Sequence, residues 1–161
     1  MSDATTSQEE SKAPKTDRRI KRLFLIGILV GCVGVYFYQT RSLTIDGWGD
    51  DLAAALTQAK SENRPVVALF VAKPPSATAR RIHDGVIRKS GNQKALKKGN
   101  FIPVVVQVDR ACKGEIATKY KIDGVPTLMV LTSDGKERNR NVGNIGEAEF
   151  RDEHFLDYKP K

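Results

Sequence analysis

The sequence predicts an α/β fold, a three-layer sandwich around a mixed central sheet, preceded by one transmembrane helix. Near the N-terminus, residues 23–38 form an apolar stretch without a charged residue. Further along, residues 66–72 are continuously apolar rather than alternating, which is typical of a strand buried on both faces, and residues 101–109 are predicted to form a second buried strand. A helical pattern separates these two strands, so we expect them to be parallel and joined by a right-handed crossover.

The chain of 161 residues is basic, with a net charge of +8. Its densest basic run holds seven cations against one aspartate, and no aromatic residues are interleaved with them, so we predict that it binds no nucleic acid. We interpret the run as a solvated face, with anionic lipid or an acidic protein as the alternative partner. The seven cations are Arg80, Arg81, Arg88, Lys89, Lys94, Lys97 and Lys98.

Residues 20–40 are predicted to form a transmembrane signal-anchor helix. Sixteen uncharged residues cover about 24 Å of a hydrocarbon layer roughly 30 Å thick, and the flanking residues complete the span. A cleaved signal peptide has the same order of basic and apolar segments, but bulky residues stand where its small-residue cleavage site belongs. The basic flank precedes the span, so the positive-inside rule predicts a cytoplasmic N-terminus and an extracytoplasmic domain, periplasmic or at the cell surface.

Two further predictions concern the N-terminal part of the chain. Residues 1–19 contain few apolar side chains and are predicted to be a disordered cytoplasmic tail. Gly27 and Gly31 form a GxxxG pair, which would let two membrane helices approach closely and form a weak homodimer. The alternative is that these glycines have no such role, because glycine is common in membrane helices.

Residues 41–161 are predicted to form the globular domain. Asp50 or Asp51 can cap its first helix, and Asp134-Gly135 predicts a two-residue hairpin turn. The predicted elements are, in order, a helix ending near Glu62-Asn63, a strand over residues 66–72, a helix from Ser76 to a break at Gly91-Asn92, a turn over 93–98, a strand over 101–109, a helix over 115–120, two strands ending at 131 and 142, and a helix over 147–156.

Three segments in this order resemble thioredoxin-like proteins: the strand after Arg64-Pro65, the stretch YKIDGVPTLMVL ending at Leu131, and the turn SDGKE. The opening of the domain from Trp48 resembles the thioredoxin-like domains associated with bacterial membrane disulfide reductases. This resemblance covers about residues 47–156 and implies a thioredoxin-like fold. It also implies an active-site loop, W-C-x-x-C, directly after the first strand.

The residues that this resemblance implies for catalysis are absent. Pro75 and Thr78 stand where the two cysteines belong, although the chemistry needs a thiolate at a helix N-terminus and a second thiol three residues later. Leu69 stands where thioredoxins place a buried acid. We therefore predict a degenerate active-site loop without dithiol oxidoreductase activity. The loop consists of Pro74, Pro75, Ser76, Ala77 and Thr78, and Ser76 is interpreted as a helix cap.

Val125-Pro126 matches the cis-proline turn of the resembling family, in which the residue before the proline offers its backbone to an extended peptide. The alternative is that the proline only shapes a turn. The predicted function is a membrane-anchored, redox-inactive binding or scaffolding module with a protein or peptide partner. A purely structural appendage stays open as an alternative.

Cys112 carries a further alternative, a single-thiol redox enzyme or sensor. It lies between Arg110 and Lys113, and positive neighbours favour a thiolate. The only other cysteine, Cys32, lies inside the apolar span, so neither a disulfide framework nor a zinc cluster is predicted. His83 and His154 lack companion ligands at metal spacing and are predicted to be solvated, and we expect no metal or cofactor.

Overall fold

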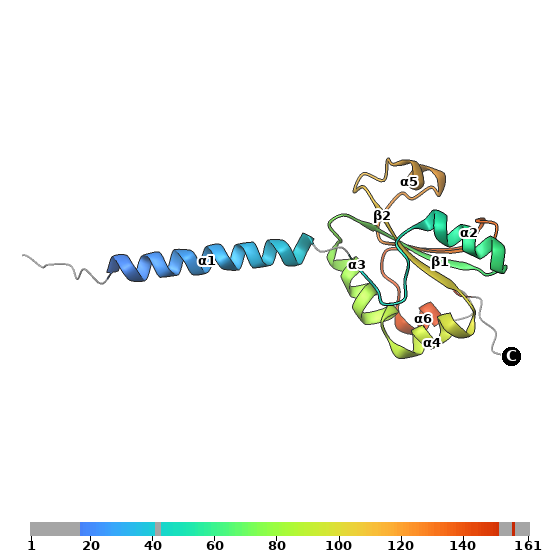
Figure 1. The fold of residues 1–161 in the computed structure, drawn as a ribbon, viewed down its shortest axis with the longest axis horizontal. Coiled ribbons are helices and arrows are strands. Elements are labelled where there is room, and N and C mark those ends of the chain that lie inside the picture. The colour runs from blue at the N-terminus through green and yellow to red at the C-terminus, as the bar shows by residue number, and fades with distance from the viewer. Residues whose placement is uncertain (1–16, 41–42, 152–155, 157–161) are drawn as a thin grey trace, which may run out of the picture. The chain divides into compact units, whose positions relative to one another are not determined.

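The computed structural model describes residues 17–40, 43–151 and 156 (Figure 1). The chain divides into two compact units, residues 1–38 and 39–161. Most of the predicted disordered tail, residues 1–16, lies outside the described residues. Residues 17–19, which were assigned to that tail, belong to the first helix.

Helix α1 (Asp17–Thr40) forms most of the first unit. Its stretch Ile20–Tyr38 is long and apolar enough to cross a membrane, and none of that stretch is buried inside the protein. A buried core helix is thus not the explanation of its apolar composition. An N-terminal signal sequence has the same length and composition, so the signal-anchor assignment stays a prediction.

The second unit is built on a four-stranded sheet in the order β2-β1-β3-β4. Strand β1 (Val66–Ala72) pairs in parallel with β2 (Ile102–Val108) and antiparallel with β3 (Thr127–Leu131), which pairs antiparallel with β4 (Glu137–Val142). All seven residues of β1 are buried. The mixed sheet and the doubly covered first strand are therefore confirmed.

Helices cover both faces of the sheet and complete three layers (Figure 1). Alternate residues of β1 enter two separate apolar cores, with Leu69 in one and Phe70 in the other. The core around Phe70 lies under α2 (Leu52–Glu62) and α5 (Glu115–Lys119). The core around Leu69 lies under α3 (Ala77–Ile82), the π-helical segment η1 (His83–Ile87), α4 (Ser90–Lys98) and α6 (Glu147–Arg151).

Helix α2 begins and ends where local chemistry favours it. The Asp51 carboxylate accepts hydrogen bonds from the amides of Ala53 at 2.8 Å and Ala54 at 3.2 Å, which satisfies donors that the first turn leaves unpaired. Asn63 ends the helix in the left-handed conformation, with φ of 49°. Asp51, and not Asp50, is therefore the cap.

The predicted break at Gly91-Asn92 and the turn over residues 93–98 are wrong, because both lie inside α4. The chain leaves the helical path earlier, at Arg88 and Lys89, after η1. Asn92 is fully buried, and its side-chain amide donates to the carbonyl of Val86 at 2.8 Å, so it joins α4 to η1. Gly91 makes room for the Arg151 guanidinium, which lies 2.8 Å from where a Cβ would stand.

The predicted hairpin is present, but its turn has three residues instead of two. The Thr132 amide donates to the Lys136 carbonyl at 2.9 Å and encloses Ser133, Asp134 and Gly135. Only Gly135, with φ of +79°, has a positive φ in this loop, whereas a two-residue type I′ turn needs two such residues. At the C-terminus, α6 covers the first five residues of the predicted helix over 147–156.

Candidate functional site

Four turns meet at one end of the sheet. Because β1 and β2 are parallel, both end there, and Ala72 pairs with Val108. Strand β3 runs the opposite way and begins there, with Thr127 opposite Phe70, and β4 ends there, with Val142 opposite Thr127. The loops after β1 and β2, the turn before β3 and the turn after β4 therefore lie together at this end of the sheet, which we call the loop edge.

The degenerate loop follows β1 at this edge. Pro74, Pro75 and Ser76 are half-buried, and the Lys73-Pro74 peptide bond is cis. The Ser76 hydroxyl oxygen accepts a hydrogen bond from the Ala79 amide at 3.1 Å and caps α3. This hydroxyl therefore serves the helix, as the N-cap interpretation predicts. Ala77 is exposed and Thr78 half-buried in the first turn of α3.

The Val125-Pro126 turn precedes β3 at the same edge, and its peptide bond is cis. The turn is braced on both sides, because the Gly143 amide donates to the Pro126 carbonyl at 2.8 Å and the Thr127 hydroxyl donates to the Gly124 carbonyl at 2.6 Å. Val125 packs its side chain against the core under α2 and α5. Its own amide and carbonyl form no hydrogen bond with any residue that the structure describes.

Cys112 lies in the loop after β2, at the same end of the sheet as the degenerate loop. Its side chain is partly buried and packs against the same apolar core as Val125. The loop is held by the Cys112 amide, which donates to the Asp109 carbonyl at 3.1 Å, and by the Lys113 amide, which donates to the Asp109 carboxylate at 2.9 Å. The proximity of Cys112 to the degenerate loop was not predicted from the sequence, although two parallel strands place the loops that follow them at the same end of a sheet.

His83 is not solvated, so the prediction for this residue is wrong. It is 8% exposed, with Nδ1 2.6 Å from an Asp84 carboxylate oxygen and Nε2 3.0 Å from the Thr44 carbonyl oxygen. The π-helical turn directs the ring toward the segment that follows α1, and no local sequence pattern signals this contact. His154 lies outside the described residues, among which no group of three potential metal ligands is found.

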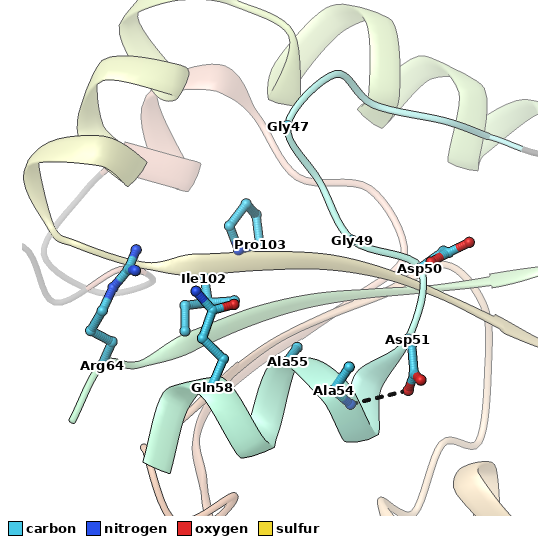
Figure 2. A pocket seen from close by; sticks show the side chains of 10 residues that line it. All are labelled: Gly47, Gly49, Asp50, Asp51, Ala54, Ala55, Gln58, Arg64, Ile102 and Pro103. Carbon is cyan, nitrogen blue, oxygen red and sulfur yellow. Dashed lines mark hydrogen bonds between the residues drawn. The ribbon is translucent and has the colours of Figure 1, made fainter. Parts of the chain in front are cut away.

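A separate cavity of about 370 Å³ lies between the Gly47–Asp51 segment, α2 and the start of β2 (Figure 2). Two of its charged groups already have partners inside the protein. The Asp51 carboxylate caps α2, and the Arg64 guanidinium donates to the carbonyls of Asn100 at 2.9 Å and Phe101 at 3.1 Å. These contacts give both side chains a structural role, and the sequence did not reveal this cavity.

Comparison with known proteins agrees with this architecture. The family described as a thioredoxin-like domain matches residues 52–156. This chain belongs to the thioredoxin-like domain family. The match spans all elements from α2 to α6, including the four strands, so the thioredoxin-like fold and the resemblance seen in the sequence are confirmed. No curated protein matches the chain.

Solved structures of thioredoxin-like proteins are similar to this domain at low identity. A thioredoxin from Thermus thermophilus is 24% identical with a TM-score of 0.56, and the match covers 66% of this chain and 82% of that chain. The C-terminal domain of DsbD from Neisseria meningitidis, in its reduced form, is 23% identical with a TM-score of 0.51, covering 62% and 86%. At such identities the likeness shows the fold alone.

The thioredoxin-like domain holds no sulfur in the loop after β1, where Pro75 and Thr78 stand. Leu69 is fully buried in the core under α3, and its side chain cannot carry a proton. The two cysteines are both free: Cys32 lies in α1 and Cys112 in the loop after β2. What this edge does offer is two rigid prolines and the unpaired backbone of Val125.

Proposed function

We propose that this protein is a membrane-anchored, redox-inactive thioredoxin-like domain that binds or scaffolds a protein or peptide partner at the extracytoplasmic face. One observation carries the proposal. Pro75 and Thr78 stand where the family has its cysteines, while the backbone of Val125 at the same edge stays unpaired among the described residues. The edge thus keeps groups that bind a strand and lacks those that exchange a disulfide.

Redox inactivity is supported by two independent losses. Thiol–disulfide exchange needs a thiolate that attacks and a second thiol that resolves the mixed disulfide. Neither Pro75 nor Thr78 supplies one, and Leu69 removes the acid that would assist proton transfer. A dithiol oxidoreductase would need thiols at both positions after β1.

Peptide binding is supported by the groups between the degenerate loop and the turn at Val125. An extended strand gains affinity from main-chain hydrogen bonds, and Val125 can supply one donor and one acceptor, because its amide and carbonyl have no partner among the described residues. Pro74 and Pro75 are partly exposed and stiff, so the loop loses little conformational freedom when a strand docks. The partner is expected to present an extended segment with apolar side chains toward these prolines.

Anchoring is supported by α1 and its basic flank. We assign residues 20–40 to a retained signal-anchor, residues 1–19 to a cytoplasmic tail and residues 41–161 to the extracytoplasmic domain. The positive-inside rule gives this orientation. Within the described part of the chain, nothing lies within 4 Å of the position that a Cβ would take at Gly27 or Gly31, so a second α1 has access to a weak dimer contact there.

Cys112 supports the second candidate, a single-thiol enzyme or sensor, because its loop lies at the same edge as the degenerate loop. Its partial burial in an apolar core opposes this role. Thiol labelling of the Cys32→Ser chain separates the two candidates. The binding module predicts labelling slower than that of an unstructured peptide thiol, and fast selective labelling of Cys112 would favour the sensor.

Insulin reduction tests the redox part of the proposal. The full chain in detergent, supplied with dithiothreitol, should reduce insulin no faster than buffer with dithiothreitol, because no thiol pair can form and resolve a mixed disulfide. An active thioredoxin in the same detergent is the positive control. Turnover above buffer would contradict redox inactivity, and its loss in Cys112→Ser would assign the activity to that thiol.

Photo-crosslinking tests the binding part. A photoreactive residue at the exposed Ala77 should capture a partner in membranes. Val125→Asp should abolish capture, because a carboxylate on this partly buried side chain disturbs the turn whose backbone pairs with the strand, and thermal unfolding shows whether the variant is still folded. Reversing Arg80 and Arg81 together should change affinity less than about tenfold, or roughly 1.4 kcal/mol. Capture should also persist as salt rises, since backbone and apolar contacts are poorly screened. If reversing Arg80 and Arg81 abolished capture and Val125→Asp did not, the contact would lie on α3 instead.

A further inference from the structure

The positive charge of the domain lies mainly on one of its two helical layers. Residues 77–98, which form α3, η1 and α4, carry seven Lys and Arg against Asp84 alone. The described residues of α6 in the same layer add two glutamates and one arginine, which leaves a net charge of +5. The helices of the opposite layer, α2 and α5, each carry one lysine and one glutamate and are neutral.

Most cations of this basic layer, defined as residues 80–98, are exposed. The exposed ones are Arg81, Arg88, Lys89, Lys94, Lys97 and Lys98. The one carboxylate within residues 80–98, Asp84, contacts His83 at 2.6 Å and Arg88 only at 3.8 Å. Large exposed apolar side chains of the domain, Ile116 and Val142, both lie on other elements.

The chain enters the domain on this same layer. Leu43 and Ile45 are buried in the core beneath α3, η1 and α4. The His83 ring of η1 contacts the Thr44 carbonyl oxygen at 3.0 Å. Helix α1 ends at Thr40, and four fully extended residues span no more than about 14 Å. Only a short piece of chain therefore separates the end of the proposed membrane span from residues that pack beneath the basic layer.

We propose that the basic layer binds the anionic phospholipid headgroups of the membrane that α1 enters. The proposal rests on the anchoring part of the proposed function. Attraction between lysines and an anionic surface acts within about one Debye length, near 8 Å at physiological salt, so a short tether keeps it effective. Long lysine and arginine side chains reach fluid headgroups without a shaped pocket.

An acidic protein fits this surface less well than a lipid headgroup does. Stable protein interfaces have a central buried cluster of aromatic or apolar anchors with a polar rim. Among its described residues, the basic layer exposes cations and small polar groups, with no large apolar side chain to form such a centre. Headgroup binding needs only a dense, exposed positive charge, which this layer has.

Energy transfer in nanodiscs tests the proposal on the full chain. A donor dye is placed at the exposed Ser90 through Ser90→Cys in a Cys32→Ser, Cys112→Ser background, and the acceptor is on lipid headgroups. Transfer should be higher with phosphatidylglycerol than with phosphatidylcholine alone and should fall to the phosphatidylcholine level in high salt. Equal transfer in both lipids would overturn the proposal.

Matched charge variants complete the test. Lys94→Gln, Lys97→Gln and Lys98→Gln together should lower transfer in anionic discs to the phosphatidylcholine level. Lys113→Gln, Lys119→Gln and Lys121→Gln remove the same charge elsewhere and should leave transfer unchanged. Equal loss of transfer in both sets would refute a specific basic layer. If transfer did not depend on the lipid, and an acidic protein bound the wild-type chain but not the variant of Lys94, Lys97 and Lys98, the partner of the basic layer would be protein instead of lipid. Thermal unfolding shows that each variant is folded, and crosslinking at Ala77 reports on the proposed function separately.

Discussion

At the scale of single residues, Arg140 joins β4 to the segment that leads into the Val125 turn. Its guanidinium donates to the Tyr120 carbonyl at 2.6 Å and the Lys121 carbonyl at 2.5 Å. It also donates to both carboxylate oxygens of Glu137, at 3.0 and 2.6 Å. These hydrogen bonds hold the pKa of Glu137 below its usual 4.5. The turn that offers the Val125 backbone is therefore supported from β4.

We predict that Arg140→Met lowers the free energy of unfolding by about 1–3 kcal/mol, because two backbone carbonyls lose charged donors. Urea unfolding of the full chain, followed by the fluorescence of its single tryptophan, Trp48, measures the loss. Glu137→Gln should cost less, no more than about 1 kcal/mol, because the carboxylate is 43% exposed. An unchanged unfolding free energy in Arg140→Met would show that the guanidinium contacts contribute nothing.

The two variants should also differ in pH dependence. The pKa of Glu137 is lower in the folded state than in the unfolded state, so its contribution is complete above its usual pKa and is lost as pH falls. The wild-type chain and Glu137→Gln should therefore approach each other in stability as pH falls from the usual pKa of 4.5 through the lowered pKa of the folded state. Arg140→Met should stay less stable at every pH, because the carbonyls of Tyr120 and Lys121 do not titrate.

At the scale of single residues, the sequence predicted which catalytic groups are missing better than it predicted which residues contact one another. The absence of sulfur at Pro75 and Thr78 and of an acid at Leu69 follows from comparing the residues in and after one strand with the pattern of the resembling family. The burial of His83 could not be predicted, because its partner Thr44 lies 39 residues away along the chain. The proximity of the Cys112 loop to the degenerate loop follows only once the strand pairing is known.

At the scale of helices and strands, apolar runs gave the right elements and turn residues gave uncertain boundaries. Seven continuous apolar residues in β1 are sufficient to predict a central strand, because such a run can be buried only between two layers. Gly91-Asn92 suggested a break for sound local reasons. Tertiary contacts decided otherwise, since Arg151 needs the space over Gly91 and Val86 accepts from Asn92.

The difference between local sequence signals and tertiary contacts also explains the hairpin between β3 and β4. Asp134-Gly135 correctly predicts a reversal of the chain, but the number of loop residues depends on which backbone positions take a positive φ. Here only Gly135 does, and the pairing shifts register between Val130 and Leu131. Leu56 of α2 lies 3.4 Å from where a Cβ on Gly135 would stand, so packing against α2 also constrains this turn.

At the scale of the whole molecule, the two proposed surfaces lie on different parts of the domain. The strand-binding edge is formed by loops at one end of the sheet, whereas the basic layer covers one of its faces. A layer bound to headgroups would leave the loop edge accessible to a partner. The charged layer would then bind the membrane, while the loop edge would bind a protein through backbone hydrogen bonds and apolar contacts.

Both surfaces depend on the orientation of α1, which is the last prediction. Four cations lie directly before the apolar stretch, at Arg18, Arg19, Lys21 and Arg22, while Arg41 alone follows it closely. Positive residues are retained on the cytoplasmic side, so the N-terminus should stay inside and the domain should lie outside. Protease added outside intact cells should remove the domain and spare an N-terminal epitope tag.

Replacing those four cations with glutamine should weaken this preference and leave part of the chains with a protected domain. The same four replacements at lysines of the domain, Lys94, Lys97, Lys98 and Lys119, serve as the control, because charges far from the span contribute little to orientation. Protection of the domain in wild-type cells would reverse the orientation. Loss of the tag from the mature chain before any protease is added would show instead that residues 20–40 are cleaved as a signal peptide, because a retained signal-anchor keeps its N-terminal tail.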